Sequence, residues 1–343
     1  MILVNQSIFP KTLSLKELNI VSFVVLNIFI PGMQTIIEVK NLTKKFKDII
    51  AVQDLSFSVH EGDVYGFLGQ NGAGKSTTIR MLLTLIKPTA GSISVFNRDL
   101  FSSREDILRK TGAIIEKPDL YNYLTAYENV AFLAKLSGRN ISRDVALEFL
   151  DMVGLAERAY SKVKTFSQGM KQRLGIAVAL VHDPSLIILD EPTNGLDPQG
   201  IADTRQLIKN LSYELGKTVV ISSHLLSEIE LIANRILIIH KGKKIVEGAA
   251  KDLLDPAKSI VEINTTDNLL MMKILTDSEW RTHIKTSVYG KIILQLDKSL
   301  IPLLINHLVQ NNVGILSVEP RHSLEDYFLS LTNPETYVEP AAI

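Results

Sequence analysis

The sequence predicts a two-domain protein in which a larger α/β domain with a mostly parallel sheet precedes a small α+β domain. The chain has 343 residues, more than the roughly 250 at which a single core usually stops growing. The continuous apolar runs 186–189 and 218–221 are typical of strands that are buried on both faces of a parallel sheet. After Gly248 the order of strand-like and helix-like segments changes, which indicates the second domain.

The composition is that of a globular protein without an excess of either charge. Hydrophobic residues make up 46% and charged residues 22%, and 37 basic residues balance 37 acidic ones. Because there is no basic excess, we expect no nucleic-acid partner. The chain contains no cysteine, which excludes disulfides, zinc–thiolate sites and thiol nucleophiles.

The first 32 residues contain the most apolar segment of the chain, residues 18–30, which Asn19 and Asn27 interrupt. The segment is shorter than the about 20 apolar residues that a membrane-spanning helix needs, and no small-residue cleavage pattern follows it. We therefore predict that residues 1–32 are a non-native or disordered extension and that the folded domain begins at Met33. The alternative is a short apolar helix that lies on the membrane or on a partner.

A glycine-rich loop lies between the apolar run that starts at Val64 and a segment with apolar residues at helical spacing. The loop has the pattern G-x-x-x-x-G-K-[ST], which would occur by chance in such a chain with a probability of about 1%. Glycines let the backbone N–H groups wrap a phosphate chain, Lys75 can reach the outer phosphates, and the Ser76 hydroxyl can bind Mg²⁺. The predicted phosphate-binding residues are Gly69, Gln70, Asn71, Gly72, Ala73, Gly74, Lys75, Ser76 and Thr77.

Polar residues follow both buried strands, at the edge where parallel sheets bind their ligands. Asp190 is placed to hold Mg²⁺, usually through water, and Glu191 to accept a proton from the water that attacks the terminal phosphate. His224 follows the neighbouring strand and is predicted to contact that phosphate. Together with Lys75, Glu191 and His224 form the predicted catalytic set. The alternatives are a solvated acidic pair, which the nearby phosphate loop disfavours, and a structural histidine, which the position of His224 at the end of the neighbouring strand disfavours.

The segment 161–192 resembles the ABC ATPase family. Its FSQGM sequence at 166–170 stands where that family carries its LSGGQ signature, with Ser167 and Gly169 retained. From the residues alone, Ser167 is the N-cap of a helix over 168–182. The resemblance implies that the nucleotide is ATP with Mg²⁺. It also implies a head-to-tail dimer in which the signature of one subunit closes over the ATP of the other, and we expect a homodimer.

Other residues match the plan of the family between about residues 36 and 248. Phe46 stands where an aromatic ring stacks on adenine, a contact that its flat apolar ring can make. The resemblance places Gly195, Leu196 and Asp197 in the loop that communicates across the dimer, with Asp197 at the nucleotide.

Glu116 follows a predicted strand at the position where most members of the family carry a glutamine that touches Mg²⁺. An acid there, together with FSQGM, resembles the exporter branch associated with bacitracin resistance and lantibiotic self-protection. The resemblance implies that Glu116 contacts the metal and the nucleotide, although its charge repels phosphates. The alternative is a surface carboxylate.

The resemblance implies a P-loop NTPase fold, with an ABC-type nucleotide-binding domain over residues 33–250 and a helical subdomain inserted at about 104–165. The accessory domain, 251–343, has its segments in a βαββαβ order that resembles a ferredoxin-like unit, followed by a helix over 324–332. An apolar cluster in the helical subdomain either contacts a membrane partner or packs internally. It consists of Leu120, Tyr121, Tyr123, Leu124 and Tyr127.

These observations predict an ATP-binding and ATP-hydrolysing subunit that powers a membrane exporter. The resemblance implies a separate integral membrane permease, a peripheral location on the cytoplasmic face of the membrane, and a cargo that is a peptide antibiotic, a lantibiotic or another amphipathic compound. One alternative is a soluble ABC ATPase that acts on ribosomes or nucleic acid. Another is a nucleotide switch without turnover, which the presence of both Glu191 and His224 disfavours.

Overall fold

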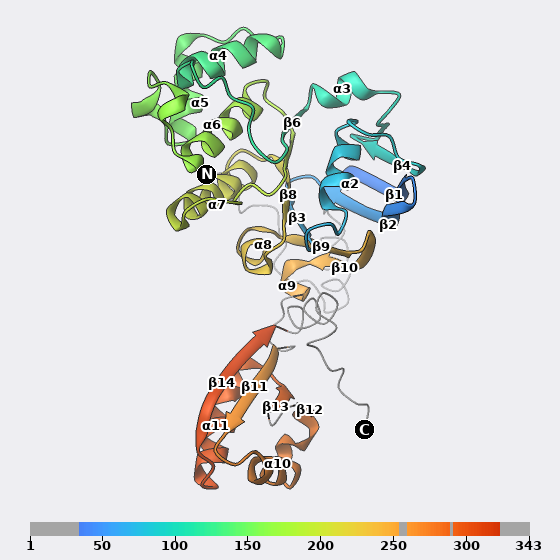
Figure 1. Ribbon diagram of the computed structural model, residues 1–343, viewed down its shortest axis with the longest axis vertical. Helices are drawn as coiled ribbons and strands as arrows, with labels where there is room; N and C mark the ends of the chain where they lie inside the picture. The colour runs from blue at the N-terminus through green and yellow to red at the C-terminus, as the bar shows by residue number, and fades with distance from the viewer. Residues whose placement is uncertain (1–33, 254–258, 289–290, 323–343) are drawn as a thin grey trace, which may run out of the picture.

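The computed structural model describes residues 34–253, 259–288 and 291–322, and contains three β-sheets (Figure 1). The N-terminal segment 1–32 and the predicted helix at 324–332 lie outside the described residues. No helix in the described part of the chain is both long and apolar enough to cross a bilayer.

The central sheet has six strands in the order β10-β9-β3-β8-β7-β6. The pairings of β9, β3, β8, β7 and β6 are parallel, and β10 is antiparallel to β9. Every residue of β3, β7 and β8 is buried, as the continuous apolar runs predicted. The strands are β3 (Val64–Leu68), β6 (Thr111–Ile114), β7 (Leu186–Leu189), β8 (Thr218–Ser223), β9 (Arg235–His240) and β10 (Lys243–Ala249).

Helices follow the central strands and bury them. The phosphate loop leads into α2 (Lys75–Leu82), and α7 (Pro198–Tyr213) follows the loop after β7. Helix α8 (Leu226–Ile232) follows β8, and short helices α3 (Arg104–Leu108) and α9 (Ala250–Leu253) complete this part of the fold. This strand–helix alternation places the carboxyl ends of β3, β7 and β8 side by side.

A second sheet, in the order β2-β1-β4-β5, is antiparallel. Its core includes an aromatic cluster in which Phe57 of β2 contacts the rings of Tyr65 and Phe67 from β3. The Tyr65 hydroxyl donates a 2.8 Å hydrogen bond to Glu247 Oε1, and burial raises the pKa of Tyr65 well above its usual value. The strands are β1 (Thr35–Phe46), β2 (Ile49–His60), β4 (Ala90–Val95) and β5 (Arg98–Asp99).

A helical layer consists of α4 (Ala126–Leu136), α5 (Arg143–Met152) and α6 (Gln168–Leu180). Helix α6 ends two residues before the predicted residue 182. The predicted range 104–165 also contains β6, which pairs with β7 and therefore belongs to the central sheet. Thr125 and Glu128 form a reciprocal capping box that fixes the start of α4.

Part of the apolar cluster of the helical layer packs internally and part is exposed, and its contact with a membrane partner stays a prediction. Leu120 and Tyr127 pack against the core, while the Tyr121 ring makes edge contacts with the rings of Tyr123 and Phe132. The Tyr123 side chain is exposed. The cluster therefore packs internally on one side and presents aromatic surface on the other.

The C-terminal sheet has the order β12-β13-β11-β14, and all its pairings are antiparallel. Its elements follow the predicted βαββαβ order, and Val261, Leu294 and Leu304 are among its fully buried residues. They are β11 (Ser259–Thr265), α10 (Asn268–Thr276), β12 (Ile284–Val288), β13 (Lys291–Gln295), α11 (Ile301–Gln310) and β14 (Ile315–His322).

Strand β6 approaches α6 so closely at Gly112 that a side chain there must displace backbone. A β-carbon at Gly112 would lie 2.3 Å from the Ala179 carbonyl oxygen. We expect Gly112→Ala to destabilise the protein by about 2 kcal/mol and to lower its thermal unfolding midpoint by about 4–8 °C. Circular dichroism measures the shift, and Ala113→Ser, on the exposed neighbour in the same strand, is the control with little expected change. An unchanged midpoint for Gly112→Ala would contradict the close packing.

Candidate active site

The phosphate loop is held in a shape that only glycine permits at two of its positions. Gly72 and Gly74 have φ angles of 82° and 108°, in the left-handed region. A β-carbon at Gly74 would lie 2.6 Å from the Ala51 carbonyl oxygen, and one at Gly69 would lie 2.6 Å from the Ile239 carbonyl oxygen. The loop is therefore packed against the backbone of β2 and β9, which leaves no room for side chains on that side.

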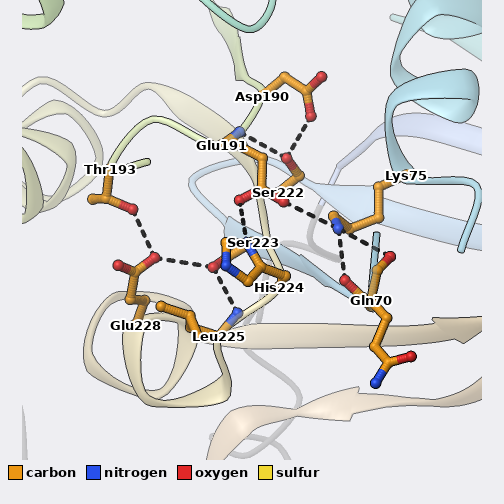
Figure 2. Close-up of polar contacts among 11 residues, drawn as sticks. Gln70, Lys75, Asp190, Glu191, Thr193, Ser222, Ser223, His224, Leu225 and Glu228 are labelled. Atoms are coloured by element: carbon orange, nitrogen blue, oxygen red, sulfur yellow. Dashed lines mark hydrogen bonds and ion pairs between the residues drawn. The ribbon is translucent and has the colours of Figure 1, made fainter. Parts of the chain in front are cut away.

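Lys75, the first residue of α2, directs its ammonium group back across this loop (Figure 2). Its Nζ donates a 2.6 Å hydrogen bond to the Gly69 carbonyl and a 3.3 Å bond to that of Gln70. Nζ also lies 3.0 Å from Glu191 Oε1, a charge contact without hydrogen-bond geometry. The lysine side chain is only 5% exposed, so its positive charge is little screened by water and interacts strongly with the loop and with the acidic residues after β7.

Asp190 and Glu191 follow β7, and Ser222 of β8 ties them to the neighbouring strand. The Ser222 hydroxyl donates a 2.6 Å hydrogen bond to Asp190 Oδ1 and accepts a 2.8 Å bond from the Glu191 backbone N–H. Asp190 is 1% exposed, and its Oδ2 has no hydrogen-bond partner among the described residues. This buried carboxylate oxygen can therefore accept a hydrogen bond from a ligand or bind a cation.

Two oxygen groups, one after β7 and one in the first turn of α2, are of the kind that Mg²⁺ binds. Oxygen ligands are those that Mg²⁺ prefers, and it commonly uses only one or two protein ligands together with water and phosphate oxygens. Asp190 Oδ2 and the hydroxyl of half-buried Ser76 are oxygens of this kind. The described residues contain no group of three or more histidine or acidic side chains that could hold a metal.

Glu191 lies between a cation and a histidine. Its Oε2 is 2.8 Å from His224 Nδ1, on the other side of the carboxylate from Lys75. Its backbone has a φ of 50°, a strained conformation for a non-glycine residue that costs about 1–3 kcal/mol. The Glu191 side chain is 16% exposed and that of His224 34% exposed, so the pair can meet a ligand at the surface. The predicted catalytic set of Lys75, Glu191 and His224 is therefore brought together in one contact network.

Phe46 and Glu116 make no described contact with the Lys75–Glu191–His224 network. Phe46 ends β1, is 44% exposed, and has Lys44 Nζ at 4.8 Å from its ring centre. Its hairpin continues into β2, whose Ala51 carbonyl lies against the phosphate loop. Glu116 has its Oε1 2.6 Å from an Arg80 guanidinium nitrogen, and its side chain is largely exposed. Its nucleotide and metal contacts remain predictions.

The signature residues lie at the start of a helix, as predicted. The Ser167 hydroxyl accepts a 3.2 Å hydrogen bond from the Met170 N–H and caps α6. Asp197 caps α7 in the same way through Gly200 N–H at 3.2 Å. The two helix starts are close, because a β-carbon at Gly169 would lie 3.6 Å from the Gly200 Cα. No described hydrogen bond joins Ser167 or Asp197 to the phosphate loop.

Four residues of the site were not predicted from the sequence: Thr193, Ser222, Ser223 and Glu228. All four make hydrogen bonds beside Glu191 or His224 (Figure 2). The serines directly precede His224 at the end of β8, and this polar ending of an apolar strand could have signalled their role. Nothing in the sequence pattern distinguishes Glu228 from other helical glutamates.

Comparisons with known proteins show what this chain is similar to. The ABC transporter family profile matches residues 52–194. The bacitracin transport ATP-binding protein BcrA of Bacillus licheniformis is 42% identical over 304 residues, 87% of this chain and 98% of that protein. The lantibiotic transport ATP-binding protein SrtF of Streptococcus pyogenes is 44% identical over 211 residues, 62% of this chain and 90% of that protein. The dimeric ATP-binding cassette MJ0796, in a post-hydrolysis state bound to ADP and Pi, has a TM-score of 0.57 at 31% identity and covers 62% of this chain and 98% of its own.

The position of Lys75 leads to a prediction about nucleotide binding. We expect Lys75→Ala to weaken ATP binding roughly tenfold to hundredfold, because it removes a buried charge-assisted donor. Titration with a fluorescent ATP analogue measures the change. The control is Lys135→Ala, on an exposed position of α4, which should bind like the unmodified protein. Equal affinities for the two variants would contradict the assignment of the phosphate site.

The position of Glu191 leads to a prediction about turnover. We expect Glu191→Gln to bind ATP but to hydrolyse it about 10²-fold to 10⁴-fold more slowly, because an amide cannot act as the base. It should accumulate an ATP-bound dimer, which size-exclusion chromatography with light scattering detects. Glu157→Gln, on an exposed residue outside the site, is the control and should remain active. Hydrolysis at the unmodified rate by Glu191→Gln would remove the glutamate from this role.

Proposed function

Because this chain belongs to the ABC transporter ATP-binding family, whose members are ATPases, we propose that it powers a membrane exporter whose permease is a separate chain. The observation that carries the proposal is the contact network of Lys75, Glu191 and His224 at the ends of α2, β7 and β8. A phosphate loop alone would support binding. A carboxylate placed between the loop cation and a histidine supports turnover.

In the proposed mechanism each residue has a separate task. The phosphate-loop N–H groups and Lys75 hold the phosphate chain, and Glu191 accepts a proton from the attacking water. His224, held against the Glu191 carboxylate, contacts the terminal phosphate and keeps the base in place. Mg²⁺ would be held by Asp190 and Ser76, and when bound it neutralises charge on the phosphate oxygens.

We further propose that two copies of the chain form the complete sites. Ser167 and Gly169 lie at the N-terminus of α6, where unpaired N–H groups favour an anion, yet no described hydrogen bond ties them to the phosphate loop of their own chain. A head-to-tail homodimer would bring this signature over the nucleotide of the second copy. The dimeric relative bound to ADP and Pi supports a dimer of such cassettes.

The cargo is inferred from the relatives. BcrA proteins named for bacitracin transport come from Bacillus licheniformis and Enterococcus faecalis, and the SrtF protein is named for lantibiotic transport. We propose that the exporter carries a peptide antibiotic, a lantibiotic or another amphipathic compound.

The chain would then lie on the cytoplasmic face of the membrane. The exposed Tyr123 and its aromatic neighbours are the proposed contact with the permease.

Recovery of a trapped complex tests this function. We expect tagged Glu191→Gln, isolated with ATP from detergent-solubilised cells, to bring with it a stoichiometric integral membrane protein. Mass spectrometry identifies that partner, and Lys75→Ala treated in the same way controls for nucleotide dependence. Recovery of ribosomes or nucleic acid in place of a membrane protein would instead support a soluble ABC ATPase and contradict the exporter.

A further inference from the structure

Glu228 of α8 joins the loop after β7 to the end of β8 (Figure 2). Its Oε2 accepts a 2.6 Å hydrogen bond from the Thr193 hydroxyl and a 2.9 Å bond from the Ser223 hydroxyl. Both donors are buried, Thr193 at 6% exposure and Ser223 at 2%. One carboxylate oxygen thus satisfies two buried hydroxyls, one from the loop after β7 and one from the end of β8.

The two hydroxyl residues flank the proposed catalytic pair. Ser223 directly precedes His224, and its oxygen also accepts a 3.0 Å hydrogen bond from the Leu225 N–H on the other side of the histidine. Thr193 stands two residues after Glu191. The backbone on both sides of His224 and the turn that leaves Glu191 are therefore held by contacts that converge on Glu228.

The position of Glu228 is fixed because α8 packs directly on β3. A β-carbon at Gly66 of β3 would lie 2.6 Å from Ile229 Cγ2, so only glycine lets the helix come this close. Ile229 is fully buried and adjoins Glu228 in the sequence. Because β3 leads into the phosphate loop, the carboxylate is fixed relative to that loop.

Thr193 also begins the turn that leads to the loop of residues 195–197. Its carbonyl accepts a 3.2 Å hydrogen bond from the Leu196 N–H, and Asp197 then caps α7. A displacement of this loop by a second subunit would act on Thr193 and, through Glu228, on Ser223. The contact chain therefore connects the proposed dimer surface with the histidine.

We propose that Glu228 is a positioning residue for ATP hydrolysis, which sets the Glu191–His224 pair and couples it to the loop 195–197. A carboxylate suits this task because, as an anion, it accepts from both hydroxyls at once, and losing it leaves two buried donors unpaired. The inference rests on the roles given to Glu191 and His224 in the proposed function.

Steady-state kinetics of the full chain tests the proposal. We expect Glu228→Ala to lower kcat for ATP hydrolysis about tenfold to hundredfold, as for a displacement of reacting groups by about 1 Å. KM for ATP should stay within about twofold, because the phosphate loop is untouched. Glu228→Gln keeps one acceptor oxygen and should recover much of the loss. Ser227→Ala, on the exposed neighbouring residue of α8, should leave both constants unchanged.

A double variant separates positioning from a general loss of structure. If Glu228 acts through the histidine, Glu228→Ala in a His224→Ala background should lower kcat further by less than about threefold. If Glu228→Ala does not fold, Thr193→Val and Thr193→Ser carry the test, because serine keeps the hydroxyl and should turn over faster than valine.

Two results would overturn the positioning role. One is an unchanged kcat for Glu228→Ala when His224→Ala does lower kcat. The other is a loss in the double variant equal to the product of the single losses. An active His224→Ala protein would instead refute the role given to the histidine, so the two failures are distinguishable.

Discussion

The in-register parallel pairing of β3, β8 and β7 determines where the polar residues at their carboxyl ends lie. Leu68, the last residue of β3, is paired with Ser223 of β8, and Leu189 of β7 is paired with Ile221. The residues that follow these positions are therefore delivered to one edge of the sheet. A shift of one strand by a single residue would turn alternate side chains to the other face and separate Glu191 from His224.

Glycine is required wherever the backbone at this edge is crowded. Gly69 and Gly74 let the phosphate loop lie against the backbone of β9 and β2, and Gly66 lets α8 lie on β3. These close approaches leave the loop little freedom to rearrange, because the neighbouring groups are backbone or buried side chains. A rigid loop keeps its N–H groups oriented toward a phosphate without further ordering on binding.

Carboxylates at the site alternate with groups that are positively charged or donate hydrogen bonds. The Lys75 ammonium contacts the Glu191 carboxylate, which contacts His224, while Asp190 is separated from this pair by the Ser222 hydroxyl. A buried acid beside a second acid would be unfavourable without such partners. Glu228 extends the pattern with hydroxyl donors in place of cations. Each of these carboxylates is therefore held by partners within the proposed site, so the proposed chemistry and the stability of the site depend on the same contacts.

The sequence by itself determined those features of the site that depend only on residues adjacent in the chain. The phosphate loop from Gly69 to Ser76, the pair Asp190–Glu191 and the placement of His224 were predictable, because strand, turn and helix-start signals are local in the sequence. The βαββαβ order of the C-terminal segments was predictable for the same reason. The sequence cannot show the ion pair of Glu116 with Arg80, the membership of β6 in the central sheet, or the contact of Glu228 with Thr193. Thr193 and Glu228 are 35 positions apart, and only the packing of α8 on β3 brings them together. Contacts of that kind depend on which faces are buried against each other, and that is decided when the whole chain folds.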